Sequence, residues 1–210
     1  MEPKIIQLPG DENINKLVFT IDNFLSDKEC DNFLKLINNN DFQKAPIGDK
    51  NKSIESETRN NSRTFLDDEK IIENLWNKIK IIDSIPKTMT NNVFKLKGLF
   101  KNLLFYKYNV GEYFKEHYDG DKIDGNKKSF FTLLIYLNDS FEGGETNFIH
   151  YDRKIIKKKL KQDKILTPII PKKGQLLIFK HNILHEGSIV KSGEKLVLRS
   201  DIMYEKNKTY

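Results

Sequence analysis

The amino-acid sequence predicts an α+β protein that is mainly β, with two N-terminal helices followed by an antiparallel sandwich or barrel. Three observations support this class. Helical spacing of apolar residues ends before residue 80, the segments after Pro86 are short and apolar or alternating, and Gly, Asn, Asp or Pro separate them. The 210 residues suit one domain with its own core, and 14 Phe and 8 Tyr argue against disorder.

Each predicted helix carries a start signal. Ser26 and Glu29 have the spacing of a capping box, and the apolar residues behind them keep helical spacing until three asparagines predict the helix end. Asp67 or Asp68 can cap the second helix, whose apolar stripe comprises Ile71, Ile72, Leu75, Trp76 and Ile79. Because both helices precede the β segments, we expect them to cover one outer face of a sheet.

Between the helices, residues 41–65 are polar and contain Pro46 and Gly48, so they are predicted to form a long loop. Loops of this length inside compact domains often serve a functional site. We therefore interpret residues 47–65 as a lid, with Arg59 and Arg63 as contacts either to the substrate or within the lid.

Seven segments after Pro86 are predicted strands. They are VFKLKGLF, NLLFYKY, FFTLLIYLN, TNFIHY, QLLIFK, SIVK and KLVLRSDIMY. We expect a single domain over residues 1–210, with a helical N-terminal part and substrate-side loop at residues 1–92 and a β core at residues 93–210.

The net charge of +6 is concentrated in one segment. Residues 153–164 (RKIIKKKLKQDK) contain seven basic residues and one acidic residue, 7 − 1 = +6, so the remainder of the chain is formally neutral. Such runs are usually solvated, and we interpret this one as a lysine-rich hairpin or loop. The alternative is a contact to nucleic acid, although the segment lacks the interleaved aromatic residues of single-strand binders.

Cysteine usage and hydropathy bear on the location of the protein. Cys30 is the single cysteine, so no intramolecular disulfide forms, and the first residues contain no apolar stretch long enough for a signal peptide or a membrane span. We expect an intracellular, cytoplasmic protein that does not contact a membrane. Cys30 lies on the apolar stripe of the first helix and is expected to be a buried structural thiol.

Three residues have the pattern of a transition-metal site. His117 and Asp119 are two residues apart, so on a strand both side chains point to one side. A third ligand is needed, and a sandwich can bring His185 close from a later strand. Two histidines and one carboxylate on one face are typical of non-haem iron oxygenases. Asp121 shares the face of Asp119 and is an alternative ligand, whereas His150 and His181 lack a partner pattern and are predicted non-ligands.

A lysine near the end of the chain is also informative. Lys195 begins an apolar strand, where an inward lysine is costly unless it meets a carboxylate belonging to a ligand. Arg199 lies four residues later on the same strand face. It either assists in binding that ligand or pairs with Asp201 or another carboxylate.

The segments from about residue 103 to residue 205, about half of the chain, follow the motif order of one enzyme family, with a fainter match upstream. YNVGEYFKEHYD matches its first metal-ligand strand, FTLLIYLNDSFEGGETNF the next strand pair with a Gly-Gly-Glu-Thr turn, and PKKGQLLIF, LHEGSIVKSGEK and LRSDIMY the closing strands. Upstream, RNNSRTFLDDEKIIENLWNKI matches the substrate-side loop and its helix. Together they resemble the prolyl 4-hydroxylase-like iron(II)/2-oxoglutarate-dependent dioxygenase family. The resemblance implies a double-stranded β-helix, or jelly-roll, core with N-terminal buttressing helices.

Carried over residue by residue, the resemblance implies a catalytic iron(II) site formed by His117, Asp119 and His185. It implies that Lys195 binds the C5 carboxylate of 2-oxoglutarate, and that further cosubstrate contacts come from Tyr108, Tyr136, Thr132 and Arg199, with Thr146 facing the same cavity. The two tyrosines are equally typical of half-buried strand residues. The implied cofactors are iron(II), the cosubstrate 2-oxoglutarate and O2, with ascorbate as an accessory reductant.

The implied reaction couples decarboxylation of 2-oxoglutarate to succinate with hydroxylation of a substrate. A prolyl residue of a peptide or protein is the first hypothesis for that substrate. One alternative is an oxygenase acting on nucleic acid or a nucleotide, which the basic residues 153–164 support. The other is a non-catalytic jelly-roll binding module, which the complete triad and Lys195 argue against. Slow turnover of 2-oxoglutarate without substrate separates the enzyme from the binding module.

Overall fold

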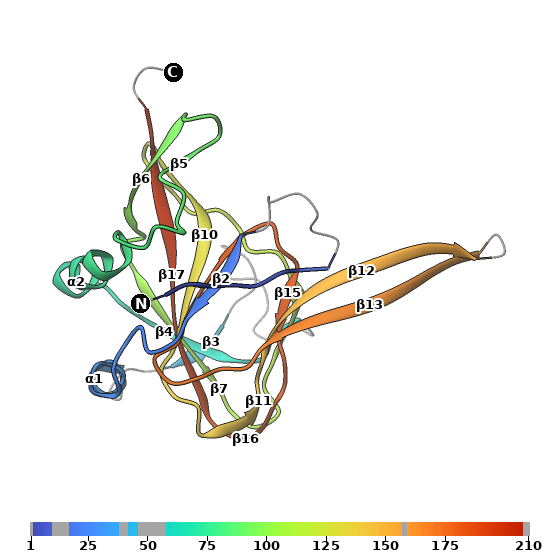
Figure 1. Ribbon diagram of the computed structural model, residues 1–210. Coiled ribbons are helices and arrows are strands. Elements are labelled where there is room, and N and C mark those ends of the chain that lie inside the picture. Colours follow the sequence, from blue (N-terminus) through green and yellow to red (C-terminus); the bar gives the residue numbers. More distant parts are fainter. Residues whose placement is uncertain (1, 10–16, 38–41, 46–57, 157–158, 208–210) are drawn as a thin grey trace.

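The protein is built around one large antiparallel sheet, seen in a computed structural model (Figure 1). The structure describes residues 2–9, 17–37, 42–45, 58–156 and 159–207, without the side chains of residues 153–162. Within these ranges the sheet runs β1–β2–β14–β10–β17–β7–β4–β3, and β5, β6 and β9 pair along its sides. The strands are β1 (Lys4–Ile5), β2 (Val18–Ile21), β3 (Gln43–Lys44), β4 (Ser62–Leu66), β5 (Thr88–Met89), β6 (Phe94–Leu99), β7 (Leu103–Tyr108), β9 (Ile123–Asp124), β10 (Lys127–Tyr136), β14 (Leu176–Lys180) and β17 (Lys195–Lys206).

A second, smaller sheet faces the first and has the order β13–β12–β15–β8, while β11 and β16 form a separate ribbon. These strands are β8 (Phe114–His117), β11 (Phe141–Gly143), β12 (Thr146–Ile156), β13 (Lys159–Ile169), β15 (His185–Gly187) and β16 (Val190–Gly193). Phe148 of β12 packs edge-on against Phe179 of β14 with ring centroids 5.2 Å apart, which joins the two layers. The predicted jelly-roll class is confirmed.

Two helices cover the outer face of the large sheet, on the left in Figure 1. Helix α1 (Asp27–Ile37) begins at the predicted capping box, in which the Ser26 N–H donates to Glu29 Oε2 (2.9 Å) and the Glu29 N–H donates to Ser26 Oγ (3.3 Å). Helix α2 (Glu69–Ile79) begins at Asp68, whose side chain accepts a hydrogen bond from the Ile71 N–H (3.0 Å). Both predicted helices are confirmed.

Burial of the helices completes the main core. Phe33 of α1 lies 6.1 Å from Phe105 of β7, between ring centroids, and Leu75 and Ile79 of α2 are buried in the same cluster. Cys30 is fully buried there, and burial raises the pKa of its thiol to about 11, as expected for a structural cysteine.

The segment predicted as a long loop is partly a strand. Residues 62–66 form β4, which pairs with β7 and with the short β3, so the loop prediction for residues 41–65 is wrong at residues 43–44 and 62–65. The composition of this segment hid the strand because the polar Ser62 and Thr64 occupy its buried positions, whereas the apolar Phe65 is exposed. Most of the predicted lid, residues 47–57, lies outside the described residues.

The basic segment forms the outer half of a long hairpin. β12 and β13 pair over eleven residues each, from Thr146–Ile169 outward to Ile156–Lys159, and together they project from the body as an arm (Figure 1). In the described part of the chain, no helix has both the length and the apolar composition needed to cross a membrane.

We predict that Asp68→Ala destabilises the protein by about 1 kcal/mol, because the substitution removes the acceptor for an N–H of the first turn of α2. Urea unfolding should show a lower midpoint with an unchanged slope. Asp67→Ala is the matched control and should leave the midpoint near that of the parent. An equal loss in both variants would contradict the assignment of Asp68 as the cap.

Candidate metal and cosubstrate site

Two histidines face each other across neighbouring strands of the smaller sheet. His117 ends β8, His185 begins β15, and the strand register pairs them directly. Nδ1 of His117 lies 2.7 Å from the Lys115 carbonyl oxygen, and Nδ1 of His185 lies 2.9 Å from the Ile183 carbonyl oxygen. Because a carbonyl only accepts, each Nδ1 carries the proton, and each Nε2 keeps its lone pair for a metal.

Asp119 lies just beyond the end of β8, where its N–H donates to the His181 carbonyl (3.2 Å). Its carboxylate oxygens lie 3.7 Å from Nε2 of His117 and 3.6 Å from Nε2 of His185. One donor atom from each of the three residues lies within 4.8 Å of the other two. His117 and Asp119 were predicted to share a strand. The strand β8 ends at His117, yet the two side chains still point toward the same place.

The protonation states of this group suit a metal ion. Burial, assisted by the neighbouring His185, lowers the pKa of His117 to about 3, and burial also lowers the pKa of His185. Burial opposes ionisation of Asp119, but Arg199 and the two histidines hold the pKa of that carboxyl well below its usual range. Two neutral imidazoles and one carboxylate are the donor set and the protonation state that iron(II) requires.

Two side chains orient the Asp119 carboxylate. Thr132 Oγ1 donates to Oδ2 at 2.5 Å, and Arg199 Nη1 lies 2.9 Å from Oδ1. Arg199 Nη2 also lies 3.6 Å from Asp201 Oδ1. Of the two roles predicted for Arg199, the structure therefore contains the pairing with carboxylates. Its side chain is 10% exposed, and the residue still lines the cavity beside the three metal-binding candidates.

Lys195 is a buried cation without a carboxylate partner among the described residues. It is 3% exposed, Nζ donates to the Gly144 carbonyl at 2.5 Å, and the rings of Tyr108 and Tyr136 lie 5.1 and 5.6 Å away. Burial lowers the pKa of Lys195 to about 7. A carboxylate of a ligand would offset the cost of burying this charge.

The Gly-Gly-Glu-Thr turn holds Lys195 in place. Gly143 and Gly144 have φ values of +74° and +67°, and a Cβ on Gly143 would collide with the Ile189 carbonyl, so the turn requires glycine. The second glycine then presents its carbonyl to Lys195. The turn therefore both reverses the chain and supplies the carbonyl that binds the Lys195 side chain.

One cavity between the two sheets contains most of the predicted site residues. Its walls are formed by Tyr106, Tyr108, Phe114, His117, Asp119, Thr132, Leu134, Thr146, Phe179, His185, Glu186, Gly187, Lys195, Val197 and Arg199. Tyr136 lies behind the wall, where its hydroxyl is 2.8 Å from Thr146 Oγ1. The structure therefore brings the three metal-binding candidates and Lys195 into one enclosure.

The two predicted substrate arginines differ. Arg59 is 7% exposed, and its guanidinium lies over the rings of Phe114 (4.1 Å) and Tyr106 (5.0 Å) at the cavity wall. Its Nη2 is buried and has no hydrogen-bond partner in the described part of the chain. Arg63 lies on β4, pairs in register with Tyr106, and is not among the residues that form the cavity walls.

Sequence reasoning missed Tyr106. Burial opposes its ionisation, yet Arg199 and Arg59 leave the pKa of Tyr106 below its usual value. The signal was present in the alternation of LLFYKY, because Tyr106 shares a strand face with Tyr108.

Asp121, His150 and His181 do not belong to the group of three metal-binding candidates. Asp121 forms an ion pair with Lys128 (2.7 Å) and lies 3.3 Å from His181 Nδ1. His181 Nε2 is 3.1 Å from Asp201, and despite burial these carboxylates raise the pKa of His181. His150 lies in a separate pocket, so none of these three residues contributes to the metal group.

The fold and the site define the class as a jelly-roll protein with a two-histidine, one-carboxylate group that could hold a metal ion. Residues 103–200 match the family model of the 2OG-Fe(II) oxygenase superfamily. Probable prolyl 4-hydroxylase 7 of Arabidopsis thaliana is 29% identical over 85% of this chain, and prolyl 4-hydroxylase 2 of the same plant is 28% identical over 84%. The chain spans 60% and 64% of the lengths of these two relatives.

Solved structures agree with this class. The viral collagen prolyl hydroxylase of Paramecium bursaria Chlorella virus-1, in its 2-oxoglutarate complex, is 25% identical with a TM-score of 0.57, over 90% of this chain and 96% of that one. A prolyl hydroxylase from Trichoplax adhaerens, in complex with a hypoxia-inducible-factor peptide, shares the fold with a TM-score of 0.57, at 15% identity over 91% of this chain and 84% of that one. Over residues 103–200 the chain is similar to the 2OG-Fe(II) oxygenase superfamily, and over most of its length it is similar to prolyl 4-hydroxylases.

We predict that His117→Ala, Asp119→Ala and His185→Ala each abolish iron(II) binding while the fold survives, because two remaining ligands hold the ion poorly. Iron content after anaerobic loading and circular dichroism provide the two measurements. His150→Ala is the matched control and should bind iron like the parent. Full iron binding by His185→Ala would show that the assignment of this ligand is wrong.

We predict that affinity for 2-oxoglutarate falls as the pH rises above about 7. The free Lys195 amine loses its proton near that pH, a bound carboxylate favours the charged form, and binding at higher pH must therefore take up a proton. The loss is up to about tenfold per pH unit. Anaerobic titration calorimetry of the iron-loaded protein at several pH values measures it.

Two variants separate this effect from simple loss of contact. Lys195→Arg keeps its charge and should flatten the pH dependence, whereas Lys195→Ala should weaken binding by about two decades or more at neutral pH. Arg199→Ala should reduce iron affinity more than affinity for 2-oxoglutarate, because Arg199 contacts Asp119. The reverse order would make Arg199 the main carboxylate anchor.

Proposed function

We propose that the protein is an iron(II)- and 2-oxoglutarate-dependent oxygenase that hydroxylates a peptide or protein, with a prolyl residue as the first candidate. One observation carries the proposal. A cavity with three metal-donor atoms within 4.8 Å of one another also contains a buried lysine that lacks a carboxylate partner among the described residues. A dicarboxylate that binds the metal at one end and the lysine at the other satisfies both groups.

Iron(II), 2-oxoglutarate and O2 would supply hydroxylation of a C–H bond, with conversion of 2-oxoglutarate to succinate and carbon dioxide. His117, Asp119 and His185 would hold the metal, and the backbone carbonyls bound to the two Nδ1 atoms fix both ring orientations. Thr132 and Arg199 hold the carboxylate in place. With its ligands held in this way, the metal would supply the binding of the cosubstrate and O2 next to the substrate.

Other residues of the cavity would serve the cosubstrate. Lys195 would pair with its distal carboxylate, and Tyr108 beside Lys195 restricts where that carboxylate lies. Leu134, Phe179 and Val197 supply apolar walls that exclude water and so strengthen the ionic contacts inside.

The substrate class is supported by the relatives rather than by the cavity alone. The named relatives are prolyl 4-hydroxylases, and one structural neighbour is described in complex with a peptide. Arg59, with its unpartnered Nη2 at the cavity wall, is the proposed contact to that substrate, and Arg63 on the adjacent strand is a weaker candidate. Nucleic acid is the second candidate substrate, and the basic segment at residues 153–164 supports it.

The test is a panel of proline-containing peptides and single-stranded oligonucleotides, incubated with iron(II), 2-oxoglutarate, ascorbate and the protein. We expect succinate to form slowly without substrate and faster with a peptide that gains the mass of one oxygen atom. Arg59→Ala should raise the KM for that peptide while succinate formation without substrate persists.

Two results would argue against the proposal. Oxygen gain in the oligonucleotides alone would favour the nucleic-acid oxygenase. No succinate from the fully loaded protein would favour a binding module. His117→Ala serves as the inactive control for every peptide that scores.

A further inference from the structure

The smaller sheet changes width along β12. Near the metal site β12 pairs with β13 on one side and with β15 on the other, but the ladder to β15 covers only residues 146–148, whereas the ladder to β13 continues to residue 156. The last hydrogen bond on the β15 side runs from the Ile149 N–H to the Leu184 carbonyl (2.9 Å). Beyond it, the arm has two strands among the described residues (Figure 1).

The step leaves backbone groups without a partner strand in the described part of the chain. In an antiparallel ladder, successive residues direct their N–H and C=O groups alternately to the two neighbouring strands. Ile149 bonds toward β15, so the backbone groups of Tyr151, Arg153 and Ile155 point to the same open edge. Such an edge is a template for a further strand.

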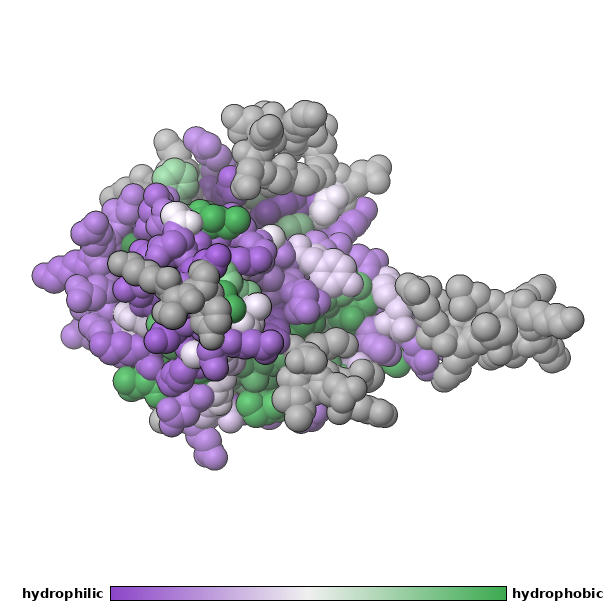
Figure 2. Space-filling view, turned by 90° about the horizontal axis from the view of Figure 1, so that it is seen from above, coloured by the Kyte–Doolittle hydropathy of each residue, from purple (hydrophilic) through white to green (hydrophobic). Residues whose placement is uncertain are grey.

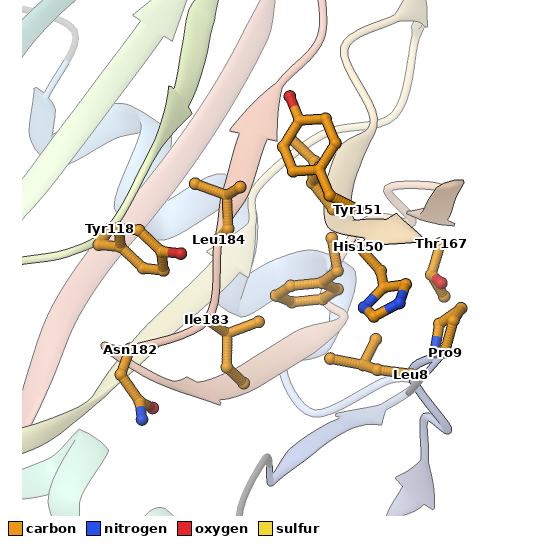
Figure 3. A pocket seen from close by; sticks show the side chains of 11 residues that line it. Leu8, Pro9, Tyr118, His150, Tyr151, Thr167, Asn182, Ile183 and Leu184 are labelled. Atoms are coloured by element: carbon orange, nitrogen blue, oxygen red, sulfur yellow. The ribbon is translucent and has the colours of Figure 1, made fainter. Parts of the chain in front are cut away.

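A cavity of about 370 Å³ lies at the start of this open edge. Its size is within the range of ligand pockets. Figure 3 shows Leu8, Pro9, His150 and Thr167 on one side and Tyr118 and Asn182 on the other, with Ile183 and Leu184 between them. Phe148, Ile149 and Tyr151 of β12 complete the lining.

The lining suits an uncharged, largely apolar side chain. It contains no Asp, Glu, Lys or Arg. The side chains of Tyr118, His150, Thr167 and Asn182 make no hydrogen bond within the described ranges, so their polar groups remain available. Tyr118 is 62% exposed, and Leu166 at the base of the arm is 45% exposed. Figure 2 shows hydrophobic surface where the arm leaves a mostly hydrophilic body.

The pocket shares a wall with the metal site. The Phe148 ring lines it and also lies 6.2 Å from the His185 ring, between centroids. Ile183 lines it as well, and its carbonyl accepts the hydrogen bond from His185 Nδ1. Tyr118 stands between His117 and Asp119 in the sequence, with its side chain in this pocket. A ligand here would therefore lie one layer of side chains from the metal.

We propose that the open edge of β12 and this pocket bind an extended polypeptide segment by strand addition. An apolar residue of the segment enters the pocket, and acidic residues follow along the edge, because the edge leads into the segment 153–164 with its net charge of +6. The proposal rests on the proposed function for one point, that the segment flanks the hydroxylated residue. The edge then selects substrates by a sequence distant from the reacting residue.

The experiment uses a fluorescein-labelled peptide with one phenylalanine followed by alternating threonine and glutamate, added to the iron-loaded full chain and followed by anisotropy. Tyr151→Pro removes the N–H on the open edge and spares the ladder to β13, so affinity should fall at least about tenfold. Tyr151→Ala is the matched control, because it loses the ring and the hydrogen bond to Glu116 but keeps the N–H. It should bind the peptide within a few-fold of Tyr151→Phe, a second control that loses only the hydroxyl.

The pocket and the charge have their own variants. Thr167→Trp should fill the cavity and lower the affinity for the peptide about tenfold, whereas Thr167→Val should leave the affinity unchanged. Replacing Lys157, Lys158, Lys159 and Lys161 with Glu changes the net charge of residues 153–164 from +6 to 3 − 5 = −2. It should therefore weaken binding of the acidic peptide at low salt and reverse the salt dependence, with succinate formation in the absence of substrate within a few-fold of the parent.

Three outcomes would overturn the inference: Tyr151→Pro binds like Tyr151→Ala, the peptide does not bind the parent, or a single-stranded RNA binds more tightly than the peptide and loses affinity in the quadruple variant. Failure of the proposed function would give a different result from failure of this inference. In that case the peptide binds as expected, but the loaded protein forms no succinate and no peptide gains oxygen.

Discussion

The site depends on the pairing of β8 with β15. This short antiparallel ladder places His117 opposite His185, residues that are separated by most of the β core in the sequence. The Lys115 and Ile183 carbonyls beside the two histidines then set both ring tautomers, so one set of backbone contacts positions the donors and prepares their lone pairs. Because β15 also pairs with β12, the same ladder ties the metal site to the projecting arm.

Two buried charges give the cavity its polarity. At one end, the Asp119 carboxylate is compensated by Arg199 and Thr132 before any metal binds. At the other end, Lys195 is held by a carbonyl and two aromatic rings, without a carboxylate among the described residues, and burial lowers its pKa to about 7. Burying an unpaired cation is unfavourable, and proteins accept such costs at functional sites. This asymmetry is the physical basis for the proposal that a dicarboxylate spans the cavity.

The smaller sheet contains both the candidate metal ligands His117 and His185 and the open edge of β12. Near His185 it has four strands, which hold the metal donors, and beyond Leu184 two described strands continue as the arm. The change in width produces both the open edge and the pocket, so a segment bound there lies against the back of the metal site. The basic character of residues 153–164 then acts along an edge close to the site instead of on a detached tail.

The sequence alone predicted the two helices, seven of the strand segments and the metal-donor candidates, because these depend on local signals: the capping box at Ser26, the cap at Asp68, the alternation of the β segments and the spacing of His117 and Asp119. Its polar composition misled at residues 62–66, where strand pairing with β7 overrides local preference. Only the tertiary structure decided that Arg199 pairs with Asp119, that Lys195 is buried without a carboxylate partner in the described ranges, and that β12 outruns β15. Such contacts join residues far apart in the chain, and the register that brings them together is set by the packing of two whole sheets.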